Sequence, residues 1–129
     1  MIAADSSALL AIALRETEHD MFVDLIGANR CLIGTPVAFE SHMVLRDRIG
    51  AEGIELLNGL LSLRTVELVT FDRELLAVAR TAFDHYGKGR SPAKLNFGDC
   101  MSYAVAKFHD VPLLFKGDDF RLTDIRAAL

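Results

Sequence analysis

Short apolar runs alternate with longer segments in which apolar residues recur at helical spacing. The short runs predict four strands: Met1–Ala4, Arg30–Gly34, Val66–Phe71 and Val111–Phe115. The longer segments predict six helices: Ala8–Leu14, Thr17–Ala28, Thr35–Ile49, Ala51–Leu63, Asp72–Tyr86 and Asp99–His109. Strands that alternate with helices are typical of a parallel sheet covered on both faces. We therefore expect an α/β protein with a single domain over residues 1–129.

Residues with known capping preferences bound several of these helices. Thr17 and Thr35 are expected N-caps, and Pro36 suits the first turn of the helix that Thr35 opens. Gly50 is expected to end that helix, and Asp72 to cap the helix that follows the third strand.

Four acidic residues lie at positions where the fold should desolvate their carboxylates, which costs free energy. Asp5 follows the first strand, Asp99 opens the last helix, and Asp119 comes after the last strand, next to Asp118. Glu40 shares an apolar helix face with Val37 and Val44. A desolvated carboxylate is costly unless something positive pairs with it. Ligands of parallel α/β sheets bind at the carboxyl ends of the strands, where these acids should meet.

A converging acidic cluster calls for a divalent cation and points to metal-assisted chemistry on a phosphate ester. Each acid also has a plain alternative. Asp5 and Asp99 could be N-caps, Glu40 an ordinary surface residue, and Asp118 and Asp119 solvated turn residues.

Composition narrows the function classes. The chain has 129 residues, 51% of them hydrophobic, which is enough for a real core and excludes global disorder. Its net charge of -4 argues against a non-specific nucleic-acid binder. Cys31 and Cys100 lie in apolar stretches and should be buried free thiols. Neither a signal peptide nor a membrane span is visible, so we expect a cytoplasmic protein.

The segment Gly87–Gly98 is a loop rich in Gly with three cations and no acid. Its Lys88, Arg90 and Lys94 could clamp a polynucleotide backbone beside the acids, or the loop could simply be solvated. The four histidines have no zinc spacing, and no Walker, GxGxxG or GxSxG motif occurs.

Several stretches together give the chain a family resemblance. It resembles the VapC toxins, ribonucleases of the PIN-domain family, through the motifs DSSAL (5–9), TPVAFES (35–41), YGKGR (86–90), LNFGDCMSYAVAK (95–107) and PLLFKGDDFRLTDI (112–125). The resemblance implies a three-layer α/β/α sandwich, an endoribonuclease that depends on Mg²⁺ or Mn²⁺, and a cognate VapB-like antitoxin. It also implies a homodimer.

The resemblance assigns roles to individual residues. The family's acidic quartet falls on Asp5, Glu40, Asp99 and the pair Asp118-Asp119. Many members carry the fourth acid where this chain has Gly117, so the role moves to Asp118 or Asp119. Asp119 is preferred because it keeps the step from Asp to Phe. Ser7 and Thr123 occupy the places of supporting hydroxyls.

Two other interpretations stay open on the sequence alone. A phospho-accepting receiver domain would also be α/β with acids at strand ends, and Lys116 would suit its phosphate. Against this interpretation, the chain lacks an Asp at the end of a central strand near the middle of the sequence. The other interpretation is a catalytically inactive PIN-like binding module. It stays open because the fourth acid is not at the position where many family members carry it.

Overall fold

The protein is built around four parallel strands in the order β3-β2-β1-β4. The computed structural model describes residues 1–129. Its strands are β1 (Ile2–Ala4), β2 (Cys31–Gly34), β3 (Val66–Val69) and β4 (Leu113–Leu114). The sequence placed all four correctly, but β3 and β4 are shorter than the apolar runs that contain them.

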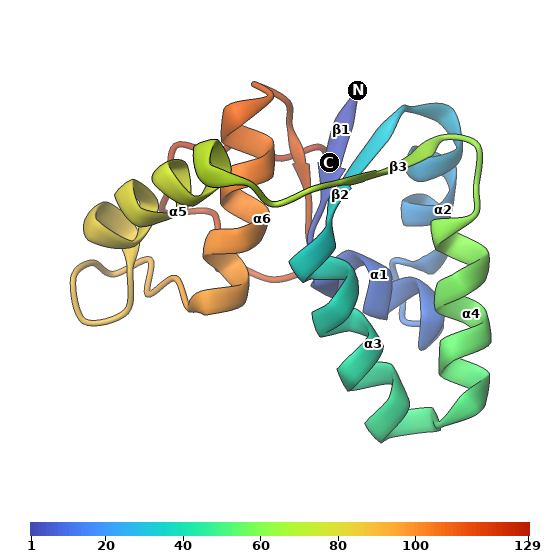
Figure 1. Ribbon diagram of the computed structural model, residues 1–129. Coiled ribbons are helices and arrows are strands. Elements are labelled where there is room, and N and C mark those ends of the chain that lie inside the picture. The colour runs from blue at the N-terminus through green and yellow to red at the C-terminus, as the bar shows by residue number, and fades with distance from the viewer.

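Six helices flank this sheet and make the three-layer α/β/α sandwich that the resemblance implied (Figure 1). One face is covered by α6 (Phe97–Phe108), against which α5 (Arg73–Tyr86) packs. The other side holds the remaining four, α1 (Ser6–Ala13), α2 (His19–Ala28), α3 (Thr35–Ile49) and α4 (Ala51–Leu61). None of them is long and apolar enough to span a bilayer.

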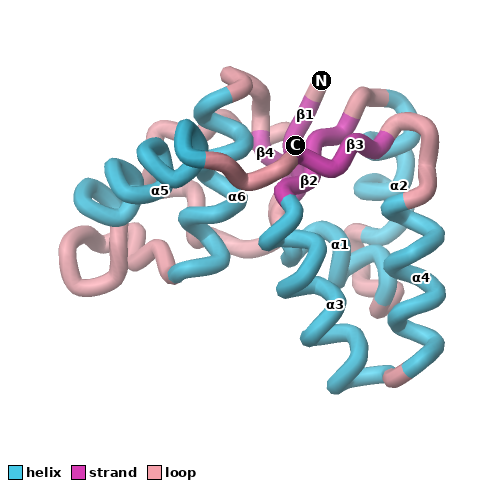
Figure 2. The backbone as a smooth tube through the Cα atoms, in the orientation of Figure 1, coloured by secondary structure: helices cyan, strands magenta, loops and turns pink.

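Strand register brings the carboxyl ends of three strands to one edge of the sheet (Figure 2). Ala3 of β1 is the register partner of Leu32 in β2 and of Leu113 in β4. All pairs are parallel, so the chain leaves β1, β2 and β4 in the same direction. The residues that follow these strands therefore start from neighbouring points.

The apolar core lies around the two central strands. Every residue of β1 and β2 is buried, and α1 is buried along most of its length, as its sequence ALLAIAL predicted. Cys31 and Cys100 are both buried and free, as expected. Burial raises the pKa of the Cys31 thiol to about 12, so this cysteine is a packing residue with no thiolate character.

Several helix starts and two expected N-caps differ from the sequence prediction. The first helix begins at Ser6, two residues before the predicted Ala8, and the second begins at His19. The third begins at Thr35 as predicted, but Gly34 is its N-cap, so neither Thr17 nor Thr35 is a cap. The last helix begins at Phe97, two residues before the predicted Asp99, because the Asn96 side chain accepts the Asp99 backbone N–H. Gly50, at φ +65°, ends α3 as predicted.

Candidate functional site

Asp5 lies where β1 passes into α1 and is held from two sides. It is the N-cap of α1, and it is also buried, at 5% exposure. Its Oδ2 accepts the Ser7 backbone N–H at 3.1 Å and the Ser7 hydroxyl at 2.6 Å. Its Oδ1 accepts the hydroxyl of Ser102, on α6, at 2.5 Å. The capping alternative and the buried-acid prediction thus both hold for this residue.

Asp99 occupies the third position of α6, within the first turn of the helix. Its Oδ2 accepts the Asn96 backbone N–H at 3.1 Å, and the Asn96 side chain accepts the Asp99 N–H at 2.9 Å. This reciprocal pair is a capping box, so the N-cap role belongs to Asn96. Asp99 is buried at 8% exposure, with its carboxylate at the positive end of the helix dipole.

Glu40 reaches from α3 to the start of α6. Its carboxylate lies so close to Gly98 that a β-carbon at this glycine would overlap both carboxylate oxygens. Gly98 therefore leaves the space that Glu40 fills, directly beside Asp99. Glu40 is half-buried, so the surface alternative does not describe it.

The two adjacent acids after β4 differ in their surroundings. Both are exposed, in the turn that follows Gly117. Asp118 accepts a hydrogen bond from Arg121 Nε at 2.9 Å and has a side chain 91% exposed. Asp119 has no such cation, and its charge acts on Asp99. Asp119 is thus the acid of this pair whose charge reaches Asp99.

The pKa of Asp99 reflects the charges of the other three acids of the quartet. This pKa is raised to about 6, chiefly by burial and also by the charges of Asp119, Asp5 and Glu40, while the hydrogen bond from the Asn96 backbone acts in the opposite direction. These acids come from four separate parts of the chain: the end of β1, α3, α6 and the turn after β4. The charges of the other three act on Asp99, so the fold brings each of them into its neighbourhood.

No cation of the protein neutralises this cluster. Asp5, Glu40, Asp99 and Asp119 take part in no ion pair, although Lys and Arg side chains pair with other acids elsewhere. The donors are all carboxylate oxygens, the ligand type that suits Mg²⁺ or Mn²⁺. As the side chains stand, however, no group of three or more is arranged to hold a metal ion.

The proposed supporting hydroxyls have different surroundings. Ser7 contacts Asp5 directly, and its Oγ also accepts the Lys116 backbone N–H at 3.0 Å. Thr123 contacts no acid of the quartet. Its hydroxyl donates to the Phe120 carbonyl at 2.7 Å, within the turn that follows Asp119.

Sequence reasoning missed two residues of the site, Asn96 and Ser102. Asn96 was recognisable from its spacing, because Asn followed three residues later by an acid is a capping pattern. Ser102 lies one turn after Asp99 on the same helix face, which was the only sign of its role.

Lys116 is not available for the receiver-like role considered from the sequence. Its Nζ lies 2.7 Å from Glu16 Oε2 and 3.2 Å from Glu18 Oε1, in the connection between α1 and α2. Those two acids hold the ammonium group away from Asp5.

The cationic loop lies directly before the acid-bearing helix. Gly87 and Leu95 form an isolated parallel bridge that closes the loop, and α6 begins two residues later. Lys88 and Lys94 are exposed, and the Arg90 guanidinium lies 5.2 Å from the centre of the Phe83 ring. The loop that carries the three cations thus leads directly into the end of α6 that carries Asp99.

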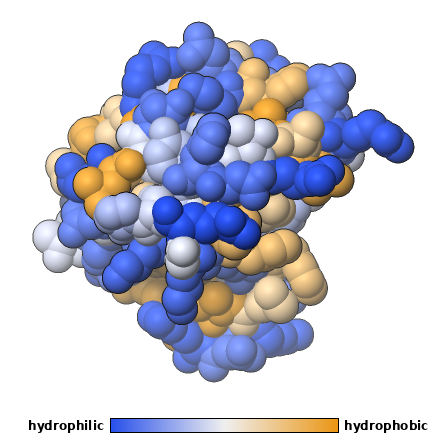
Figure 3. All heavy atoms as spheres, turned by 90° about the vertical axis from the view of Figure 1, so that its left-hand side faces the viewer, coloured by the Kyte–Doolittle hydropathy of each residue, from blue (hydrophilic) through white to orange (hydrophobic).

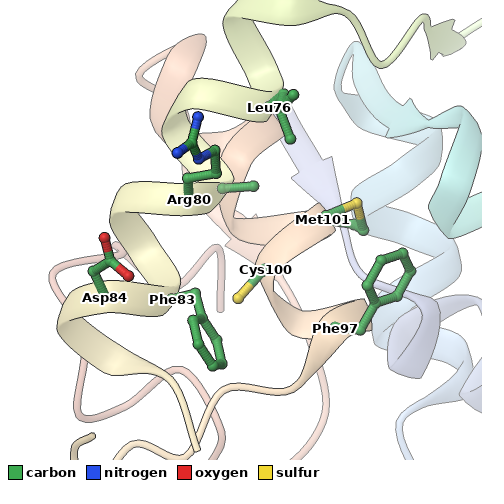
Figure 4. Close-up of a pocket in the computed structure, with 8 residues that line it drawn as sticks. Leu76, Arg80, Phe83, Asp84, Phe97, Cys100 and Met101 are labelled. Carbon is green, nitrogen blue, oxygen red and sulfur yellow. The ribbon is translucent and has the colours of Figure 1, made fainter.

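A largely apolar cavity of about 450 Å³ lies between α5 and α6, beside the acids (Figure 4). It is lined by residues of both helices: Leu76, Ala79, Arg80, Phe83 and Asp84 of α5, and Phe97, Cys100 and Met101 of α6. None of the four acids lines this cavity, so the cluster itself remains the candidate active site.

Comparisons with known proteins agree with this geometry. Residues 2–125 match the PIN domain family. The chain is 40% identical to Ribonuclease VapC of Mycolicibacterium smegmatis over 124 residues, which cover 95% of this chain and 96% of that one.

Two solved structures share the fold. The sarcin–ricin loop cleaving toxin VapC20 of Mycobacterium tuberculosis superposes with a TM-score of 0.78 at 16% identity, over 97% of this chain and 96% of that one. A toxin–antitoxin complex from Klebsiella pneumoniae contains a chain that matches with a TM-score of 0.71 at 14% identity, over 96% and 93%. The family match, the close relative and the shared fold lead to one conclusion: the chain belongs to the PIN-domain family, among its VapC members.

Proposed function

We propose that the protein is a metal-dependent endoribonuclease and the toxin component of a type II toxin–antitoxin module. The observation that carries this proposal is the quartet Asp5, Glu40, Asp99 and Asp119, gathered at one sheet edge with no cationic partner. The close relative named Ribonuclease VapC supports the RNA substrate.

The four acids have distinct roles in this proposal. Asp5, Asp99 and Asp119 would hold Mg²⁺ or Mn²⁺, Glu40 completes the shell of acids, and Asp118 is the reserve candidate for the fourth place. A bound divalent cation supplies an acidified water and offsets charge on the phosphoryl oxygens. Ser7 keeps the Asp5 carboxylate oriented, and Gly98 leaves room for Glu40 next to Asp99.

The products follow from the choice of nucleophile. A water that attacks the scissile phosphorus in line makes the RNA 2′-hydroxyl unnecessary. Cleavage should therefore leave 5′-phosphate and 3′-hydroxyl ends.

A metal titration followed by incubation with RNA tests the proposal. We expect calorimetry to detect Mn²⁺ binding to the purified protein, and the same sample to cleave RNA once Mn²⁺ is present. Binding without cleavage would favour the inactive module. A receiver domain would instead take a phosphoryl group from a small phosphodonor and leave RNA intact.

The cationic loop should affect RNA affinity more than chemistry. Replacing Lys88, Arg90 and Lys94 together with Ala should weaken RNA binding and flatten its salt dependence, by about one unit of slope or less per lost phosphate contact. Binding measured by fluorescence anisotropy at several salt concentrations checks this. Arg46→Ala, on the exposed end of α3, is the control, because it removes a cation far along the chain from the loop. An unchanged slope in the triple variant would make the loop an ordinary solvated segment.

A VapB-like antitoxin is the proposed protein partner. Phe22, Ile26, Leu57 and Leu61 are the apolar residues that the sequence alone would offer to such a partner, but the first three are buried in the core and Leu61 is half-buried. The exposed apolar residues here are Met21 and Val23 of α2, Leu56 of α4 and Leu63 just after α4. Val23, Leu56 and Leu63 line a shallow cavity of about 280 Å³ between α1, α2 and α4.

An antitoxin that covers this cavity could extend to the acids and neutralise them with an Arg or Lys side chain. We expect growth arrest when this chain is expressed alone, and relief when the neighbouring reading frame is expressed with it. Replacing Leu56 with Asp should weaken capture of the antitoxin while RNA cleavage persists. If the chain is harmless alone and no co-encoded partner binds it, the toxin assignment should give way to a housekeeping nuclease.

The family resemblance also implies a homodimer. Phe97 is 78% and Phe39 is 62% exposed, and Leu76 and Phe83 of α5 are exposed as well. Seen from the α5 side, the surface carries hydrophobic areas between hydrophilic ones (Figure 3). Sedimentation of the purified toxin and of its antitoxin complex would measure how many copies associate.

A further inference from the structure

The hydrogen bonds around Asp5 leave its carboxylate with one open position. An ionised carboxylate has about four lone-pair sites, two on each oxygen. The Ser7 N–H and the Ser7 hydroxyl both donate to Oδ2, which fills that oxygen. The Ser102 hydroxyl takes one of the two sites on Oδ1. A single lone pair, on Oδ1, remains for a ligand.

Ser102 is the residue that decides the direction of this open position. It comes from α6, the helix that also carries Asp99, and it is 1% exposed among apolar neighbours. A buried hydroxyl in such surroundings is costly unless it is hydrogen-bonded. Its one hydrogen bond crosses from α6 to Asp5, 97 residues away in sequence, and thereby links two acids of the quartet.

We propose that Ser102 is a positioning residue that fixes Asp5 as a donor through Oδ1 alone. This inference rests on the proposed metal-dependent function and adds to it a residue that does not itself touch the metal. Ser7 holds the other oxygen, and the Lys116 backbone N–H in turn holds Ser7. The carboxylate is therefore fixed before any ion arrives.

Metal affinity, measured without RNA, is the readout that separates positioning from mere packing. We expect Ser102→Ala to lower the affinity for Mn²⁺ in calorimetry by about 10- to 100-fold, the usual cost of removing a partner that orients a metal ligand. Ser102→Thr keeps the hydroxyl and should restore most of the affinity. RNA cleavage by Ser102→Ala should recover toward the wild-type rate as Mn²⁺ is raised, because the ligands themselves remain.

Ser41→Ala is the matched control. Ser41 is also a fully buried serine, but its hydroxyl donates to the Val37 carbonyl within α3 and contacts no acid. Both alanine variants delete one buried hydroxyl, so they should lose similar thermal stability. Only Ser102→Ala should lose metal affinity.

The outcomes separate this inference from the proposed function. If wild type binds Mn²⁺ and cleaves RNA while folded Ser102→Ala binds Mn²⁺ equally well, Ser102 has only a packing role and the inference is wrong. If wild type neither binds Mn²⁺ nor cleaves RNA, the proposed function fails and the inference falls with it. Should Ser102→Ala not fold, Ser102→Cys, with a similar volume and a weaker donor, should show an intermediate affinity; wild-type affinity in that variant would overturn the inference.

Discussion

Asp99→Asn should abolish metal-dependent RNA cleavage and leave the fold intact. The amide keeps the shape of the carboxylate, and its oxygen can still accept the Asn96 N–H that completes the capping box. It lacks the charge that a divalent cation requires. We expect a loss of at least about 100-fold in cleavage rate, since even residues that only orient metal ligands cost 10- to 100-fold. A single-turnover cleavage assay measures this, and cleavage at the wild-type rate would show that the assignment of Asp99 is wrong.

The same variant should be more stable than wild type in the absence of metal, in a manner that depends on pH. The pKa of Asp99 is raised to about 6 in the folded protein, above its ordinary value of 3.8. Between these pH values the folded state binds more protons than the unfolded state, so wild-type stability falls as pH rises through this window. Above about pH 6 this loss is complete and stays constant.

Asn does not titrate, so Asp99→Asn escapes this loss. Its stability advantage should be largest above pH 6 and should shrink as pH falls toward 4. Chemical denaturation in EDTA at pH 4.5 and pH 7.5 checks the difference. A stability advantage that is equal at both pH values would mean that the metal-free fold does not disfavour the charged form of Asp99.

Asp119→Ala should reduce cleavage strongly, whereas Asp118→Ala should have a mild effect. The two acids are adjacent and both exposed, so the two variants differ little in their effect on folding. Asp119 repels Asp99, but Asp118 is paired with Arg121 and turned to solvent. Each variant serves as the control for the other. Equal activity in both would mean that either acid serves as the fourth member of the quartet, or that neither does.

The strands and helices could be predicted from the sequence because the spacing of apolar residues matches the buried faces of these elements. The α1 sequence ALLAIAL is apolar on all sides, and α1 is buried as predicted. Helix starts were harder to predict, because Thr17 and Thr35 have the right chemistry for a cap but not the backbone position. At α6, the capping box of Asn96 and Asp99 places the helix start at Phe97, two residues before the predicted start at Asp99.

The acids of the site were also predictable, and so was the hydroxyl of Ser7 beside Asp5, but the role of Ser102 was not. Asp5 and Glu40 are recognisable because a carboxylate beside apolar residues is expensive. A serine within an apolar helix gives no comparable sign, since Ser102 gains its role only when α6 packs against the end of β1. The sequence favoured Asp119 over Asp118 only through its position before Phe120, whereas the ion pair of Arg121 with Asp118 becomes visible only in the fold.

The chemistry of the RNA ends tests the central claim most directly. Purified protein, free of antitoxin, is incubated with total bacterial RNA and Mn²⁺, and the product ends are identified by mass spectrometry. A water nucleophile delivered at the acid quartet predicts 5′-phosphate and 3′-hydroxyl ends, with no cleavage in EDTA. Products that carry 2′,3′-cyclic phosphate and 5′-hydroxyl ends, or cleavage that persists in EDTA, would contradict the proposal that the four acids act through a metal ion.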